Sequence, residues 1–144
     1  MTGTLIAPFR PLEGAPATGD IPTATRIRRE KQAAIVEIRG DVTLYSSPNV
    51  RKVILKTLDD HAVQRVIVNF NSVKFLDSSG LASLVECLLY SRKSHQRLSL
   101  CGLRDGPRRV LELTRLIDVF EVFDDMETAL SALPHGPQPI PYSR

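Results

Sequence analysis

Three consecutive residues, Asp77 to Ser79, carry oxygen-bearing side chains, and Gly80 follows them directly. An apolar run at 66–70 precedes this stretch and predicts a buried strand. The apolar residues after it have the i, i+3, i+4, i+7 spacing of one helix face: Leu81, Leu84, Val85 and Leu88. A helix start has unpaired backbone N–H groups and the positive end of the helix dipole. We therefore expect two serine hydroxyls at a helix start, a place that also accommodates a phosphate.

The simplest interpretation of Asp77, Ser78 and Ser79 is a helix cap. Covalent modification is a second interpretation, because capping and modification both use a hydroxyl at a helix start. Phosphorylation adds about −1.5 to −2 charges at neutral pH, and the helix dipole would tolerate them. The effect of a phosphate should therefore fall on a bound partner rather than on the fold. Gly80 is open to two interpretations as well, a steric requirement or room for an approaching kinase.

Several enzymatic chemistries lack the residues that they need. A serine hydrolase would need a GxSxG elbow around Ser78 and a histidine base, and the elbow is absent. The three histidines, His61, His95 and His135, are far apart and lack the spacing of metal ligands. The chain also has neither a Gly-rich nucleotide loop nor the acid cluster of a phosphate-accepting receiver domain. We therefore predict a protein that is not an enzyme and that needs no metal ion and no cofactor.

The composition is that of a soluble globular domain. The chain has 144 residues, of which 42% are hydrophobic and 24% charged, enough for one domain with a full core. Its net charge is +3, but the cations are scattered and tryptophan is absent, which disfavours nucleic-acid binding. The basic residues Arg104, Arg108 and Arg109 are read as solvated surface charge, with a role towards a phosphate or a partner as the alternative.

Both cysteines, Cys87 and Cys101, lie in apolar runs outside any CxxC motif. We expect buried, reduced thiols, which indicates a cytoplasmic protein. The N-terminal sequence lacks the apolar core of a signal peptide. No apolar run approaches the roughly 20 residues that span a bilayer, so we expect no membrane span.

The remaining pattern alternates strands and helices, beginning with two strands joined by Lys31 and Gln32. We expect strands at 24–30, 33–39, 66–70, 97–101 and 120–123, and helices from Ser46 to about Asp60, from the hinge to Lys93, from Pro107 to about Thr114, and from Met126 to about Leu133. Strands separated by helices pair in parallel, whereas the first two form an antiparallel hairpin. The predicted fold class is α/β, a mixed β-sheet with an antiparallel edge hairpin and packed helices. Its domain covers 24–133, between a mobile N-terminal arm, 1–23, and a mobile C-terminal tail, 134–144.

The order of elements, the Gly40-Asp41 turn and the sequence FLDSSGL resemble the STAS domain, especially the anti-sigma factor antagonists of bacterial partner-switching systems. The resemblance covers about Arg26 to Leu133. It implies that Ser78, directly after the aspartate, is phosphorylated by an anti-sigma factor that is also a serine kinase, and that a serine phosphatase removes the phosphate. It also implies that only the unphosphorylated protein binds the kinase. The implied partner-binding residues are Gly40, Asp41, Thr43, Asp77, Ser78, Ser79, Gly80 and Leu81.

This chain departs from the family pattern at Thr43. Many members read Gly-Glu-Leu-Asp where this chain has Gly40-Asp41-Val42-Thr43, so threonine replaces the second acid. The departure implies an altered partner or a different regulation. The alternative function is a different kind of STAS protein, an interaction subunit of a lipid-transport or stress-signalling complex that acts without phosphorylation.

Overall fold

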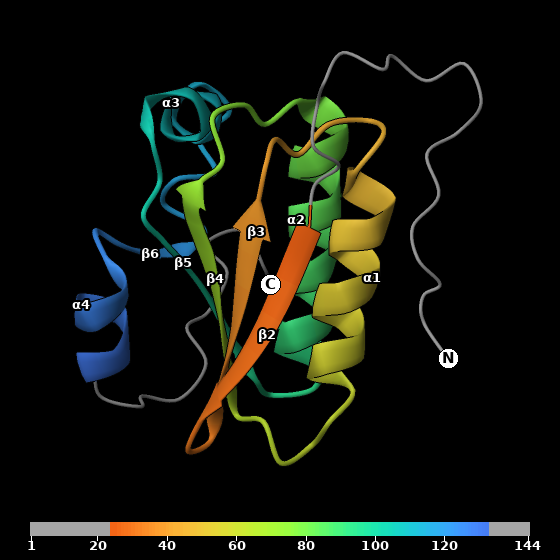
Figure 1. Ribbon diagram of the computed structural model, residues 1–144, viewed down its shortest axis with the longest axis vertical. Helices are drawn as coiled ribbons and strands as arrows, with labels where there is room; N and C mark the ends of the chain where they lie inside the picture. The colour runs from red at the N-terminus through yellow and green to blue at the C-terminus, as the bar shows by residue number, and fades with distance from the viewer. Residues whose placement is uncertain (1–23, 133–144) are drawn as a thin grey trace.

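A five-stranded mixed sheet organises the structure, a computed structural model that describes residues 24–132 (Figure 1). Its strands lie side by side in chain order: β2 (Ala24–Glu30), β3 (Ala33–Arg39), β4 (Arg65–Ser72), β5 (Arg97–Cys101) and β6 (Glu121–Phe123). β2 pairs with β3 antiparallel, and every later pair is parallel. The predicted mixed sheet with an antiparallel edge hairpin is confirmed.

Four helices connect and cover these strands: α1 (Ser47–Leu58), α2 (Ser78–Lys93), α3 (Asp105–Leu113) and α4 (Met126–Ser131). α1 and α2 lie side by side on one face of the sheet, and α4 lies on the other face (Figure 1). The order of elements is the predicted one. Because β3, β4 and β5 are parallel, the loops after them gather at one end of the sheet.

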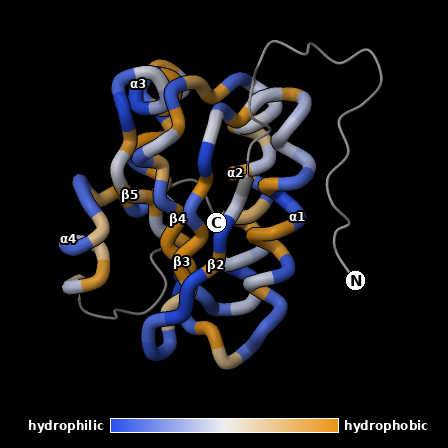
Figure 2. Tube along the Cα trace, in the orientation of Figure 1, coloured by the Kyte–Doolittle hydropathy of each residue, from blue (hydrophilic) through white to orange (hydrophobic). Residues whose placement is uncertain are grey.

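The sheet is buried on both faces at its centre, and the hydrophobic residues run along it (Figure 2). In β4 the side chains of Val66, Val68 and Phe70 join the larger core with α1, α2 and α3, whereas Ile67 joins a smaller core with α4. Near-continuous apolar runs are typical of parallel strands that are covered on both faces. Each fully buried aliphatic side chain stabilises the fold by about 1.5–3 kcal/mol.

Both cysteines are free and buried, as predicted. Burial raises the pKa of the Cys87 thiol to about 12 and that of the Cys101 thiol to about 11. Both thiols are therefore protonated at neutral pH and are packing residues rather than nucleophiles.

Some predicted boundaries are wrong. α3 begins at Asp105, two residues before Pro107, because Gly106 forms part of its first turn. Leu113, the last residue of this helix, is 75% exposed. Ser46 precedes α1 without capping it: its hydroxyl donates to the Asp41 carbonyl. The predicted arm at 1–23 and tail at 134–144, as well as His135, lie outside the described residues.

Candidate functional site

Ser78 is the first residue of α2, the longest described helix. Asp77 caps this helix, since its Oδ1 accepts a hydrogen bond from the Gly80 N–H at 2.9 Å. The Ser78 side chain is exposed, and its hydroxyl makes no hydrogen bond to any residue within 24–132. At the other end of the helix, Arg92 and Lys93 lie at the negative end of the dipole, as predicted. The hydroxyl of Ser78 is thus presented to solvent at a positive helix end.

Two loops meet at this helix start. One loop, 40–46, follows β3, and the other, 73–77, follows β4. The Val42 N–H donates to the Phe75 carbonyl at 3.0 Å, and the Asp77 N–H donates to the Val42 carbonyl at 3.1 Å. These bonds form a short parallel bridge between the two loops, which extends the β3–β4 pairing up to Ser78.

Two aspartates, one in each loop, strengthen this junction through hydrogen bonds to the backbone of the other loop. Asp41 Oδ1 accepts the N–H groups of Lys74 and Phe75, at 3.0 and 3.1 Å. Asp77 Oδ2 accepts the Leu44 N–H at 2.8 Å. Because each loop carries a carboxylate that binds the backbone of the other, the two loops form one fixed support for Ser78.

The two glycines of the predicted site have backbone and packing roles. Gly40 has φ 105°, in a region that side chains other than glycine rarely adopt. Gly80 is buried, and a Cβ on it would lie 2.7 Å from Val42 Cγ1 and 2.6 Å from Leu76 Cδ1. This packing favours the steric interpretation of Gly80, because its own domain fills the space around it.

Thr43 has a local structural role in the loop that leads into α1. Its backbone N–H donates to Ser46 Oγ at 2.9 Å, and its Oγ1 accepts the Tyr45 N–H at 3.2 Å. A threonine hydroxyl suits this kind of turn. The residue that replaces the family's acid therefore helps to shape the loop beside Ser78.

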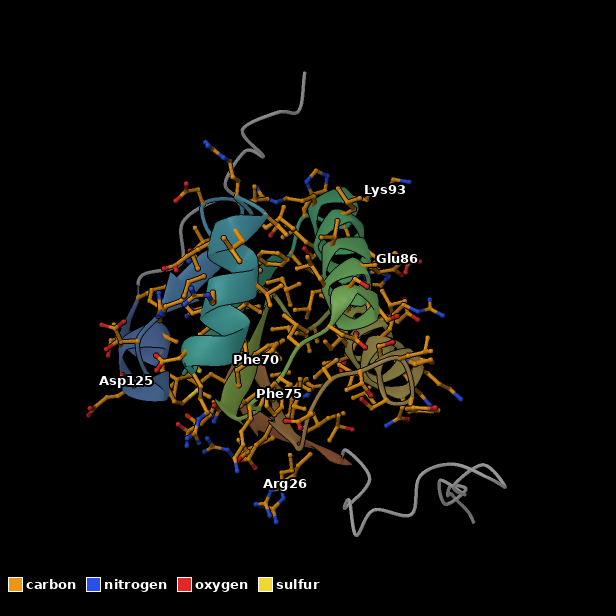
Figure 3. All side chains as sticks on the ribbon, turned by 90° about the horizontal axis from the view of Figure 1, so that it is seen from above. Arg26, Phe70, Phe75, Glu86, Lys93 and Asp125 are labelled. Atoms are coloured by element: carbon orange, nitrogen blue, oxygen red, sulfur yellow. The ribbon has the colours of Figure 1, made fainter. Side chains whose placement is uncertain are left out.

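The structure also places exposed apolar residues beside Ser78, which the sequence pattern does not predict. Leu44 and Phe75 are each 64% exposed and Tyr45 is 59% exposed; we call these three residues the apolar patch. Phe75 projects from the 73–77 loop between α3 and α1 in the view of Figure 3. Its neighbour Leu76 is buried, so the pair Phe75-Leu76 alternates out and in. That alternation, next to a polar hinge, is the signal that could have identified the patch.

Two predicted partner-binding residues remain to be placed, Ser79 and Leu81. Ser79 is half-buried in the first turn of α2, and Leu81 packs against the main core.

His61 and His95 are exposed. Within residues 24–132 no group of three or more His, Cys, Asp or Glu side chains is arranged to hold a metal ion. None of the described helices is long and apolar enough to cross a membrane.

Comparison with known proteins identifies the class of domain. The STAS domain model matches residues 24–129, and the chain belongs to the STAS domain family. Among curated proteins, it is 27% identical over 92 residues to the anti-sigma-B factor antagonist of Staphylococcus aureus, a match that covers 64% of this chain and 84% of that protein.

Solved structures share the fold at lower identity. An anti-sigma factor antagonist from Mycobacterium paratuberculosis superimposes with a TM-score of 0.69 at 20% identity, over 76% of this chain and 92% of that one. The Bacillus cell fate determinant SpoIIAA, in its phosphorylated form, superimposes with a TM-score of 0.60 at 19% identity, over 74% of this chain and 96% of that one.

Proposed function

We propose that this protein is an anti-sigma factor antagonist whose binding to an anti-sigma serine kinase is controlled by phosphorylation of Ser78. The unphosphorylated protein binds the kinase through the apolar patch and the start of α2, and it thereby releases a sigma factor. A serine phosphatase restores this form after phosphorylation. In this role the chain is a partner and a substrate of enzymes and not itself an enzyme.

The observation that carries the proposal is the exposed hydroxyl of Ser78, which makes no hydrogen bond within the described residues and lies on a fixed support beside the apolar patch. The antagonist names of its curated relatives support the same role. The two buried, reduced thiols suit the cytoplasmic location that such a switch requires.

The phosphoryl transfer would proceed by simple displacement. Ser78 Oγ attacks the γ-phosphorus of ATP, the hydroxyl proton passes to a base of the kinase, and ADP leaves. The start of α2 is suited to the new dianion, because its backbone N–H groups and dipole are positive there. The exposed position leaves the fold intact, since the phosphate points into solvent.

The phosphate would act on the complex instead. A dianion beside Asp77 and the apolar patch opposes any apolar or acidic surface that presses onto this helix start. A loss of about 3 to 5 kcal/mol would lower the affinity for the kinase by roughly a hundred- to several-thousand-fold. That range is wide enough for an effective switch.

The test begins with capture of binding proteins by the immobilised full chain, followed by purification of any GHKL-type serine kinase that is recovered. The purified kinase is incubated with the chain and ATP, and the phosphate is located by mass spectrometry. We expect phosphate on Ser78, its loss in Ser78→Ala, and its retention in the matched control Ser79→Ala. Recovery of a transporter-class ATPase without any phosphate would instead support the non-phosphorylated interaction subunit. Phosphate on another residue would refute the site.

A further inference from the structure

We infer that the kinase partner carries an acidic surface that binds four cations at the same end of the sheet as Ser78, an inference that rests on the proposed function. These cations come from the 73–77 loop and from the start of α3. We call them the basic rim: Lys74, Arg104, Arg108 and Arg109. Lys74, Arg104 and Arg109 are exposed and Arg108 is half-buried.

The rim is fixed to the support of Ser78 by direct packing. A Cβ on Gly106 would collide with the Lys74 carbonyl oxygen, so the absence of a side chain lets α3 begin against the 73–77 loop. The Arg104 guanidinium donates to the Asn71 carbonyl at 3.4 Å. Figure 1 shows α3 at the same end of the sheet as the loop from β4 to α2. The cations of α3 and the apolar Phe75 therefore lie on two segments that pack directly against each other.

The charges of the rim are not neutralised by carboxylates inside the described part of the protein. Six arginines elsewhere form ion pairs with carboxylates: Arg26, Arg28, Arg29, Arg39, Arg51 and Arg97. Across residues 24–132 no rim cation has such a pair. The acids of α3 are Asp105, which suits the positive start of the helix, and Glu112 near its end. The rim thus leaves a positive surface at the end of the sheet that carries the proposed phosphorylation site.

The combination of this rim with the apolar patch fits a protein partner. Protein interfaces have an apolar centre and a charged periphery, and Lys74 directly precedes Phe75 of the patch. A nucleic acid would meet the carboxylates of Asp41 and Asp77 at the same loops, which repel a phosphate backbone. An acidic protein surface would instead reach the rim while its apolar groups cover the patch.

The rim also makes the switch more effective. Charged residues at the edge of an interface mainly accelerate association, because they steer the partner before contact. A phosphate on Ser78 would lower the positive potential that attracts an acidic kinase. Phosphorylation would therefore slow association in addition to blocking the contact surface.

The test compares two doubly neutralised variants that change the net charge equally. R104Q/R109Q alters the rim, and K31Q/K93Q alters cations at the opposite end of the molecule: Lys31 in the turn before β3 and Lys93 at the end of α2. Association with the purified kinase is followed by stopped-flow fluorescence at low and at high salt. We expect the rim variant to associate about tenfold more slowly at low salt, with a smaller difference at high salt. The control should stay within about twofold of the wild type.

Each outcome decides between the two proposals. If the rim variant matches the control while Ser78→Asp still weakens binding, the acidic partner surface is wrong and the proposed function stands. If the wild-type chain binds no kinase, the proposed function fails and the inference fails with it. If the double variant unfolds at a lower temperature than the wild type, the single variant Lys74→Gln in the 73–77 loop replaces it, and its association rate is measured in the same way.

Discussion

The Asp77 side chain connects its own loop, 73–77, to α2 and to the 40–46 loop. One carboxylate oxygen caps α2 at the Gly80 N–H, and the other binds the Leu44 N–H in the opposite loop. A helix cap and a hydrogen bond to a charged acceptor each contribute about 1 kcal/mol or more. The residue before Ser78 therefore fixes both the start of the helix and the position of the apolar patch.

Asp77→Ala should lower the free energy of unfolding by about 2–3 kcal/mol, because both hydrogen bonds are lost. Urea denaturation measures this change, and amide hydrogen exchange at Leu44 and Gly80 should become faster. The control is Asp125→Ala, which removes the cap of α4 at the Thr128 N–H and should leave exchange at Leu44 unchanged. Unaltered protection of the Leu44 amide in Asp77→Ala would contradict the junction of the two loops.

Gly80→Ala separates helix propensity from packing. Propensity alone favours alanine over glycine in a helix by about 1 kcal/mol. The added Cβ would lie 2.6 Å from Leu76 Cδ1, 2.7 Å from Val42 Cγ1 and 3.0 Å from the Val42 carbonyl oxygen. We therefore expect a loss of about 1–3 kcal/mol in unfolding free energy, with Ser79→Ala in the same turn close to neutral. A stabilised Gly80→Ala protein would show that this contact relaxes without cost.

At the scale of elements, the face of the sheet opposite α1 and α2 carries a charged cluster. Arg65 and Arg97 begin neighbouring strands and are register partners, and each is only 8% exposed. Arg97 and Ser99 both donate to the Glu121 carboxylate on β6. Arg65 lies over the Phe123 ring, 5.7 Å from its centroid. The pKa of Arg65 is lowered, first by burial and then by the charge of Arg97.

This cluster predicts an acid dependence of stability. Burial raises the pKa of the Glu121 carboxyl, but hydrogen bonds from Arg97 and Ser99 and the two arginine charges outweigh it, so the pKa lies below its usual value. A depressed pKa stabilises the folded state above the unfolded value of about 4.3. That stability is lost as the pH falls through the lower folded value.

Glu121→Gln should therefore lower the free energy of unfolding at pH 7 by about 3–5 kcal/mol, because it leaves buried arginines without their carboxylate. The difference from the wild type should shrink as the pH falls below the unfolded value of about 4.3 and through the lower pKa of Glu121 in the folded protein. Urea denaturation across this pH range measures both quantities. Glu112→Gln, at an exposed position of α3, is the control and should show the wild-type acid dependence. A constant difference at all pH values would contradict the assignment to Glu121.

Local pattern accounts for most of the elements. The bounds of β2, β3 and β5 agree with prediction, because turn residues or apolar runs mark their ends. The predicted start of α3 at Pro107 is wrong, because the sequence Gly106-Pro107 is typical of a loop. In the structure, Gly106 is helical because its missing side chain allows contact with the Lys74 carbonyl. Such a contact between distant segments has no local signature.

At the scale of the whole molecule, the site was predictable in part. A serine at a helix start follows from the sequence around Asp77, and the carboxyl ends of parallel strands bring the loops after β3 and β4 together. The reciprocal hydrogen bonds of the Asp41 and Asp77 carboxylates were not predictable, since they depend on how the two loops align with each other. The exposure of Leu44 and Phe75 was also missed, because apolar residues are expected in the core unless a partner covers them.

The two functional proposals depend on single residues, on loops and on the whole sheet together. Hydrogen bonds of single residues fix two loops, the loops present Ser78 with an apolar patch, and the start of α3 adds a positive edge. The described residues thus offer one end of the sheet as a single surface. A charge added at Ser78 would change the affinity of that surface without changing the fold beneath it.

The most direct measurement is calorimetric titration of the purified kinase with the full chain, unphosphorylated and phosphorylated on Ser78, together with the melting temperature of both forms. We predict that phosphorylation raises Kd at least about a hundredfold while the melting temperature moves by no more than a few degrees. Equal Kd values for the two forms, or a phosphorylated chain that no longer folds, would contradict a switch that acts at the surface.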